Sequence, residues 1–261
     1  MSHISYSELK TWAECTWRHK LDYLDKLRVF KGNEYTAFGK AIHAVGEKYV
    51  FESQDDITPE EYFELQFLNE LKVLTAEDQD FVLNTKLVTE MRSQGTDLSP
   101  SVIPGLYEYF GPDIEVSSVE EKLYEDIEGN DGLKFKGFID LVVRQGDIYH
   151  ILDWKTCSWG WPSEKKRDRL MTYQLTLYKH FFSKKHNIDP KNIKTYFGLL
   201  KRTAKQNKVE IFEVNNGPKK TENALNLMKQ ALYNIKQKRF IKNKLSCRYC
   251  PYNEKPELCA K

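Results

Sequence analysis

The centre of the chain holds two apolar runs that each carry an aspartate, Gly137-Phe138-Ile139-Asp140-Leu141-Val142-Val143 and Ile151-Leu152-Asp153-Trp154-Lys155-Thr156. Their composition predicts neighbouring β-strands, with Asp140 within or at the end of the first. Asp153 and Lys155 lie two residues apart, so their side chains project from one face of the second strand. In a hairpin, Asp140 comes within a few ångströms of that pair. Two carboxylates can share a hard divalent cation, and a lysine beside it can orient or deprotonate a water molecule.

A solvated hairpin is the alternative interpretation of the same residues. The spacing Asp-x-Lys occurs often by chance and carries little weight alone. Here, however, Asp140 and Asp153 each follow two apolar residues, which places them at the ends of buried runs. Because idle burial of two carboxylates and a lysine is unfavourable, the pattern favours a metal site.

The segments around these runs predict an α/β fold with a mixed central β-sheet flanked by helices. Strands are expected at 116–127, 133–144, 148–155, 193–202 and 208–214, and helices at 35–52, from 58 onward, at 76–94, 169–185 and about 219–238. The first three strands read as consecutive antiparallel neighbours, and 95–104 reads as a loop. No repeat or low-complexity linker divides the chain. We therefore expect one domain over 1–261, with a helical insertion at about 35–112, a core at about 113–215 and a basic helix with a cysteine motif at about 216–261.

Composition limits the class of protein. The chain has 261 residues, and its 34 aromatic residues (5 Trp, 15 Tyr and 14 Phe) exclude a disordered chain. No stretch approaches the roughly 18 apolar residues that a membrane-spanning helix needs, and residues 1–10 lack a signal segment. We expect a soluble cytoplasmic protein of bacterial or phage type with no membrane partner, whose five cysteines stay reduced.

Charge is distributed unevenly along the chain. Residues 1–160 carry 16 Lys and Arg against 30 Asp and Glu, a net −14, whereas residues 161–261 carry 24 against 8, a net +16. A basic C-terminal third is typical of proteins that bind polyanions, although a well-solvated basic surface fits as well. The basic run Lys165-Lys166-Arg167-Asp168-Arg169 and the lysines of 219–244 are the candidate contacts to a phosphate backbone. Three aromatic residues near the run, Trp159, Trp161 and Tyr173, are candidates to stack unpaired bases or to pack in the core.

Three further residues fit a site at the strand ends. Gln174 and Tyr178 are four apart on the helix after Lys155, so both project from one helix face. His43 lies on an N-terminal helix and could supply an imidazole ligand. Singly, such residues are more often packed or solvated.

The order His43, Asp140, Asp153-x-Lys155 and Gln174-x-x-x-Tyr178 resembles the RecB-type branch of the PD-(D/E)XK nucleases. The resemblance spans nearly the whole chain and implies a restriction-endonuclease-like core. It implies that His43, Asp140, Asp153 and the carbonyl of Trp154 bind Mg²⁺ or Mn²⁺. It also implies that Lys155 helps to activate the attacking water, while Gln174 and Tyr178 support the site and the DNA.

The cysteines suggest a second metal site. Cys247-x2-Cys250 has a metal-chelating spacing, Cys259 follows, and Cys15 supplies a fourth ligand if the chain ends meet. This arrangement resembles the iron–sulfur subgroup of the same branch, which includes AddB-type helicase–nucleases and CRISPR-adaptation nucleases. The resemblance implies a [4Fe–4S] cluster that joins the termini. The eight residues between Cys250 and Cys259 exceed the subgroup's usual gap, which leaves Zn²⁺ as the alternative, and unligated thiols as a third interpretation.

These observations predict a metal-dependent deoxyribonuclease, an exonuclease on single-stranded DNA or DNA ends, acting in recombination, repair or phage DNA processing. Any ATP use must come from a partner such as a helicase or recombination protein, because the chain has no Gly-rich phosphate loop. One alternative is a non-catalytic iron–sulfur or zinc DNA-binding subunit of a larger helicase–nuclease or integration complex. Another is an enzyme of the same fold acting on RNA or on modified or structured DNA.

Overall fold

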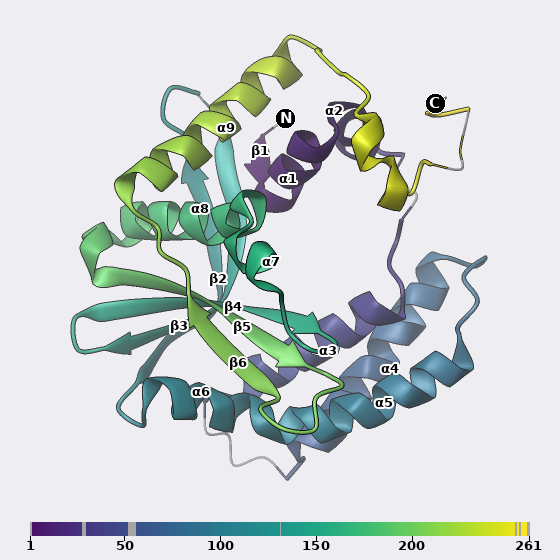
Figure 1. The fold of residues 1–261 in the computed structure, drawn as a ribbon, viewed down its shortest axis with the longest axis vertical. Helices are drawn as coiled ribbons and strands as arrows, with labels where there is room; N and C mark the ends of the chain where they lie inside the picture. Colours follow the sequence, from purple (N-terminus) through teal and green to yellow (C-terminus); the bar gives the residue numbers. More distant parts are fainter. Residues whose placement is uncertain are drawn as a thin grey trace. The chain divides into compact units, whose positions relative to one another are not determined.

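The computed structural model describes residues 2–27, 30–51, 56–130, 132–253, 255 and 257–259, and its elements are shown in Figure 1. The chain forms two compact units. Unit 1 consists of Met1–Lys31, Leu123–Gly137 and Gly217–Lys261, and unit 2 consists of Gly32–Lys122 and Phe138–Asn216. Strands β2 (Glu115–Asp126) and β3 (Lys134–Gln145) each contribute residues to both units.

The strands form a mixed sheet, which confirms the predicted fold class. Its order is β1-β3-β4-β5-β6, with β2 also paired to β3. Strand β4 (Ile148–Cys157) pairs antiparallel with β3 and parallel with β5 (Ile193–Lys201), and β6 (Val209–Glu213) pairs antiparallel with β5. The parallel pair needs a crossover, which the helix between the two strands supplies.

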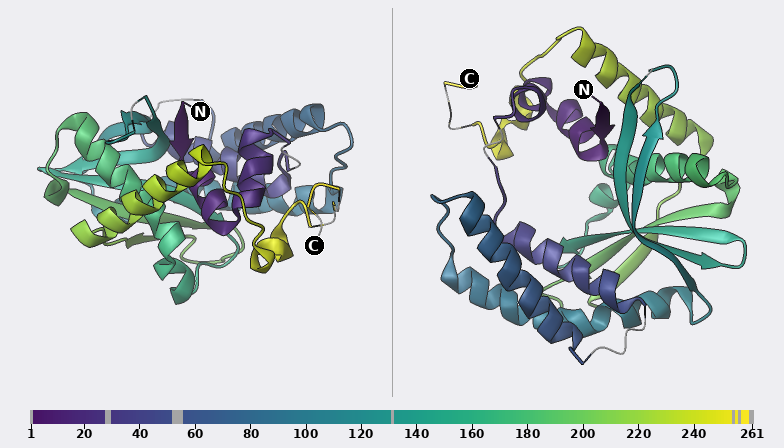
Figure 2. Two further views of the ribbon diagram at one scale, coloured as in Figure 1. Left: turned by 90° about the horizontal axis from the view of Figure 1, so that it is seen from above. Right: turned by 180° about the vertical axis from the view of Figure 1, so that it is seen from behind.

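Unit 2 carries most of the helices. They are α3 (Glu34–Tyr49), α4 (Pro59–Glu77), α5 (Thr85–Leu98), α6 (Val102–Phe110), α7 (Ser163–Arg167) and α8 (Arg169–His186), with short 3-10 turns η2 (Ser99–Ser101) and η3 (Pro190–Asn192). Capping boxes begin α3 and α4, the latter through Thr58 and Glu61 with a proline in the first turn. Helices α3, α4 and α5 lie side by side in both views of Figure 2 and contact one another.

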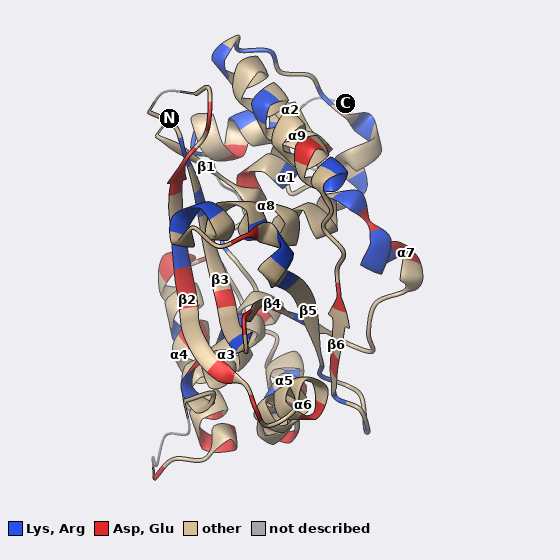
Figure 3. Ribbon diagram, turned by 90° about the vertical axis from the view of Figure 1, so that its left-hand side faces the viewer, with Lys and Arg blue, Asp and Glu red and all other residues tan. Residues whose placement is uncertain are grey.

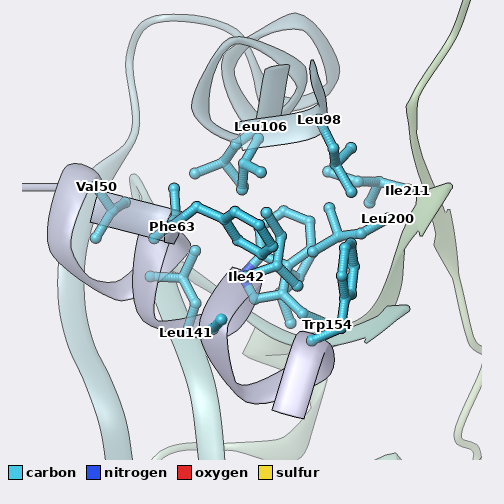
Figure 4. Packing of buried hydrophobic residues seen from close by; sticks show 14 of the residues in the cluster. Ile42, Val50, Phe63, Leu98, Leu106, Leu141, Trp154, Leu200 and Ile211 are labelled. Atoms are coloured by element: carbon cyan, nitrogen blue, oxygen red, sulfur yellow. The ribbon is translucent and has the colours of Figure 1, made fainter. Parts of the chain in front are cut away.

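Trp154 lies at the centre of the unit 2 core (Figure 4). Its indole is 1% exposed and lies across Gly198, its partner on β5. A Cβ at Gly198 would come within 2.3 Å of the Trp154 ring, so only glycine leaves room for the indole. Trp154 also contacts Gly46 of α3, where a Cβ would lie 3.2 Å from the indole nitrogen. This packing fixes the backbone of β4 beside α3.

Unit 1 brings the two ends of the chain together. It contains β1 (His3–Ser5), α1 (Tyr6–Glu14), α2 (Thr16–His19), the π-helix η1 (Lys20–Leu24), α9 (Pro218–Lys236) and the 3-10 turn η4 (Lys244–Tyr249). Strand β1 pairs in parallel with Lys134–Lys136 of β3. Asn243 Nδ2 and Ser246 Oγ each donate a 2.8 Å hydrogen bond to the carbonyl of Glu14.

Two predicted segments differ from the structure. The helix expected over 76–94 is two helices, because α4 ends at Glu77 and α5 begins at Thr85 behind the capping side chain of Asn84. The loop expected over 95–104 is helical: α5 continues to Leu98, and α6 follows the short turn at Pro100. Among the described residues, no helix is both long and apolar enough to cross a membrane.

Candidate active site

The two aspartates lie just beyond the paired part of β3 and β4. The antiparallel pairing runs as far as Leu141 and Leu152, and Asp140 and Asp153 are the next residues on each strand. The charge of Asp140 acts on Asp153, and the charge of Lys155 acts on both. Opposed residues of an antiparallel pair project from the same face, and so do residues two apart on one strand. Continuing that register places Asp140 on the face that Asp153 and Lys155 share, and the alternation of the sequence predicted this face for Asp153 and Lys155.

Backbone and helix both hold Asp140. The amide of Trp154 donates a 2.7 Å hydrogen bond to Asp140 Oδ2, and His43 Nδ1 of α3 lies 3.5 Å from the same oxygen. The imidazole of His43 also interacts with the backbone of Trp154. The predicted donors His43, Asp140 and the Trp154 main chain are thus neighbours.

Asp153 is bound on both of its oxygens. Lys155 Nζ lies 2.5 Å from Oδ2, and Gln174 Nε2 of α8 donates a 2.6 Å hydrogen bond to Oδ1. Gln174 Nε2 also lies 3.2 Å from the hydroxyl of Tyr178, one turn along α8, which accepts a hydrogen bond from it. The structure therefore joins Asp153, Lys155, Gln174 and Tyr178 into one polar cluster.

Burial sets the proton affinities of this cluster. It raises the pKa of Asp140 and of Asp153 to about 6 each, against the opposing effect of the Lys155 charge. Burial, together with the charge of Lys155, lowers the pKa of His43 to about 4. His43 is therefore neutral near pH 7, with a nitrogen lone pair for a ligand. Burial likewise raises the pKa of Tyr178, whose hydroxyl stays protonated.

Two acidic residues beside this cluster were missed by sequence reasoning. Glu47 follows His43 by four residues on α3, and burial, with the charges of Glu120 and Asp140, raises its pKa to about 7. Its spacing from His43 was a signal that the sequence offered. Glu120 stands in β2 with a left-handed backbone (φ 48°), where the burial alternation of the strand slips by one residue. The sequence carries no sign of that slip.

The donor chemistry of the site fits a hard divalent cation. Neutral imidazole nitrogen, two carboxylates and a main-chain carbonyl are ligands that Mg²⁺ and Mn²⁺ accept. As the side chains stand in the described residues, no three His, Cys, Asp or Glu side chains are grouped closely enough to enclose a metal ion. The ammonium of Lys155 lies against Asp153 Oδ2, where it compensates the buried negative charge.

Comparison with known proteins shows the family of this chain. The sequence pattern of the PD-(D/E)XK nuclease superfamily matches residues 3–255. The chain belongs to the PD-(D/E)XK nuclease superfamily. Among curated proteins there is no match.

Solved structures similar to this PD-(D/E)XK chain include a crystal structure described as "Putative exonuclease" from Eubacterium rectale. The two are 12% identical, with a TM-score of 0.57 and coverage of 97% of this chain and 88% of that one. At this identity the likeness concerns the fold alone. A second structure, described as SSO0001, is 15% identical with a TM-score of 0.38 over 87% of this chain and 97% of that one.

The predicted DNA-contacting residues of this PD-(D/E)XK chain lie on α7 and at the start of α8, where basic residues dominate α7 (Figure 3). Arg167 is exposed, whereas Lys166 is paired with Glu210. Lys165 lies 4.5 Å from the ring centroid of Trp161, and Arg169 lies 6.0 Å from that of Tyr173.

The three aromatic candidates for base stacking differ sharply in exposure. Trp161 and Tyr173 are 8% and 3% exposed, so they pack in the interior, as the alternative interpretation held. Trp159 is 74% exposed. It alone of the three presents its ring to solvent.

The four cysteines of the predicted second site all lie in unit 1, although as they stand no three of these described thiols are grouped closely enough to hold a metal ion. Cys15, Cys247, Cys250 and Cys259 line one small pocket. The thiol of Cys15 accepts a 3.4 Å hydrogen bond from the amide of Asn243, and burial raises the pKa of Cys250. The fifth cysteine, Cys157, ends β4 in unit 2 and does not line the pocket. The expected meeting of the chain ends is observed, and the identity of any bound group stays a prediction.

Proposed function

We propose that this chain is a metal-dependent deoxyribonuclease of the RecB-type branch that hydrolyses phosphodiester bonds. The observation that carries the proposal is the shared face of Asp140, Asp153 and Lys155, with Gln174 bonded to Asp153. Asp153 is buried and Asp140 and Lys155 are half-buried, and burying carboxylates and a lysine in this way is unfavourable without a function.

Each residue has a role that its surroundings support. His43, Asp140, Asp153 and the carbonyl of Trp154 would hold Mg²⁺ or Mn²⁺, which when bound lowers the pKa of water and neutralises phosphate oxygens. Lys155 would orient the attacking water and stabilise the charge that develops on the phosphate. Gln174 fixes the rotamer of Asp153, and Tyr178 in turn positions Gln174.

The substrate that we propose is single-stranded DNA or a DNA end, cut exonucleolytically. Exposed Arg167, with Lys165, Lys166 and Arg169, would contact the phosphate backbone of the DNA. Each such contact makes the logarithm of the binding constant fall by roughly 0.7 per unit of log salt concentration on single strands. A helicase or recombination protein as partner, and a role in recombination, repair or phage DNA processing, belong to this proposal.

We propose that the four cysteines of unit 1 hold a [4Fe–4S] cluster, with Zn²⁺ as the alternative. Their common pocket supports a bound group, and hydrogen bonds between Asn243 and both Glu14 and Cys15 hold the chain ends beside it. Reduced thiols are needed to bind either group, so the setting that we propose is intracellular.

The test uses anaerobically purified full chain and end-labelled single- and double-stranded DNA in Mg²⁺, Mn²⁺ or EDTA. Asp153→Asn removes a charge at the site, and Asp147→Asn is the matched control, because Asp147 is 93% exposed in a turn. Cutting that needs metal, survives Asp147→Asn and is lost in Asp153→Asn supports the nuclease, and the product ladder separates exonuclease from endonuclease. DNA binding without cutting under every condition would overturn it in favour of a non-catalytic DNA-binding subunit.

A further inference from the structure

The loop that follows β4 presents a tryptophan in a fixed backbone. Trp159 is 74% exposed, although an indole ring ordinarily gains more from burial than almost any other side chain. The preceding residue, Ser158, is held by two hydrogen bonds to its carbonyl. The main-chain amide of Thr203 donates one at 3.2 Å, and the hydroxyl of Thr203 donates the other at 2.7 Å. The amide of Arg202 also bonds the carbonyl of Cys157 at 2.9 Å. The exposed ring therefore projects from an ordered support.

A guanidinium lies next to this support. Arg202 Nη2 donates a 2.9 Å hydrogen bond to Ser158 Oγ, and Nη1 donates a 2.7 Å bond to Gln94 Oε1. Both acceptors are neutral, so these bonds orient the guanidinium without cancelling its charge. Arg202 also contacts the ring of Tyr35, at 5.2 Å from the centroid, and Tyr35 is 49% exposed. Arg202 is therefore bonded to Ser158, the residue that precedes the exposed ring of Trp159.

Trp159 lies a short length of chain beyond the site residues of β4. Trp159 follows Lys155 by four residues, which span at most about 14 Å of extended chain. A stacked strand advances roughly 3.4 Å per nucleotide, so this length corresponds to about four nucleotides. A strand whose phosphate lies at Lys155 can therefore place a nearby base on Trp159.

We propose that Trp159 is a stacking platform for an unpaired base of a single-stranded DNA substrate, with Arg202 contacting the adjoining phosphate. This inference rests on the proposed nuclease function and names the residues that would give it the preference for single strands. An exposed ring face accepts any base that is not paired, whereas bases stacked inside a duplex offer it no face. The guanidinium of Arg202, which Ser158 and Gln94 hold in place, could donate hydrogen bonds to the phosphate next to the stacked base. The platform thus selects single strands near the site of cutting without reading their sequence.

Binding in EDTA tests the platform separately from cutting. The probes are a fluorescent oligothymidylate and a blunt DNA hairpin of equal charge, whose loop is a non-nucleotide ethylene glycol linker so that it carries no unpaired base. Trp159→Ala is expected to weaken oligothymidylate binding about tenfold and leave hairpin binding unchanged, and Trp159→Phe to recover most of the loss. Arg202→Gln is expected to weaken oligothymidylate binding and to reduce its salt dependence by about one phosphate contact. The matched control is Phe51→Ala, which removes a 55% exposed ring some 16 residues along from Tyr35.

The outcomes separate this inference from the proposed function. Equal affinities in wild type and Trp159→Ala, or an equal loss on the blunt hairpin, overturn the platform even if the wild type cuts DNA. A selective loss of oligothymidylate binding supports the platform even if no metal produces cutting, in which case only the nuclease proposal fails. Circular dichroism of each variant ensures that a folded protein is compared.

Discussion

Asp140 and Trp154 are joined by a 2.7 Å hydrogen bond from the main-chain amide of the tryptophan to the carboxylate, while the indole of the same tryptophan lies in the core. The bond connects the neighbouring strands just where their Leu141–Leu152 pairing gives way to the acidic residues. Packing of the Trp154 ring therefore determines where a site carboxylate is held. Stability and site geometry depend on the same residue.

Enlarging Gly198 is expected to disturb both. A Cβ there would meet the Trp154 ring at 2.3 Å, far inside van der Waals contact, so Gly198→Ala should lower the free energy of unfolding by about 2–3 kcal/mol. Urea unfolding measures this. Gly39→Ala is the control, because a Cβ at Gly39 of α3 meets only Thr156 Oγ1 at 3.6 Å and alanine favours a helix by up to about 1 kcal/mol. Equal stabilities for the two variants would contradict the packing argument.

Gln174 is expected to act through Asp153. Its amide donates at 2.6 Å to Oδ1, so Gln174→Ala should leave Asp153 free to rotate and lower metal-dependent cutting about 10- to 100-fold. Tyr178→Phe removes the hydroxyl that accepts from Gln174, and a smaller loss is expected. The measurement is the cutting rate against Mg²⁺ concentration, with exposed Gln230→Ala as the control. A Gln174→Ala enzyme with wild-type rates and metal dependence would show that the hydrogen bond is dispensable.

His150 is expected to make stability depend on pH. Its side chain is 6% exposed and bonds the hydroxyl of Tyr196 at 3.0 Å, and burial, followed by the charge of Lys194, lowers its pKa to about 4 from 6.5. As the pH falls, His150 therefore takes up a proton at a higher pH in the unfolded chain than in the folded one. The contribution of His150 is complete above pH 6.5 and is lost as the pH falls towards 4.

A difference measurement isolates that residue, since the raised carboxyls of the site shift stability in the opposite sense. Between pH of about 7.5 and about 5, the wild type should lose about 1–2 kcal/mol more than His150→Gln in urea unfolding. If the wild type and the variant lose stability in parallel, His150 is not the titrating group.

Much of the site could be predicted because side chains repeat every two residues along a strand and about every four along a helix. Alternation alone places Asp153 and Lys155 on one face, and the four-residue spacing of Gln174 and Tyr178 places both on one side of α8. That α8 would lie against Asp153 depends on long-range packing, which one sequence does not encode in any local pattern.

The misses have local physical causes. A loop was expected over 95–104, yet Pro104 stands in the first turn of α6, where a helix tolerates the missing amide hydrogen. Asn84 was a capping residue that would have placed the start of α5 correctly. Glu120 of β2 has a left-handed backbone conformation. Glutamate has no preference for that conformation, so the sequence could not predict it.

The cysteine pocket leads to a prediction about composition and stability together. Cys15 comes from the segment between α1 and α2, and the other three thiols come from the C-terminal segment, so a bound group would cross-link the chain ends. Anaerobically purified protein should contain about four iron and four sulfide per chain. The Cys250→Ala variant should lose both iron and sulfide, and its melting temperature should fall by about 4–8 °C or more.

Cys157→Ala is the matched control, because Cys157 ends β4 in the other unit and should leave iron and melting temperature unchanged. Iron, sulfide and zinc assays distinguish the possible occupants. About one zinc per chain without sulfide would show that the four thiols bind Zn²⁺ instead of the cluster, and the bound zinc would still cross-link the chain ends. Metal-free protein, with Cys250→Ala melting at the wild-type temperature, would show that the thiols are unligated. In that case the hydrogen bonds from Asn243 and Ser246 to Glu14 would alone hold the termini together.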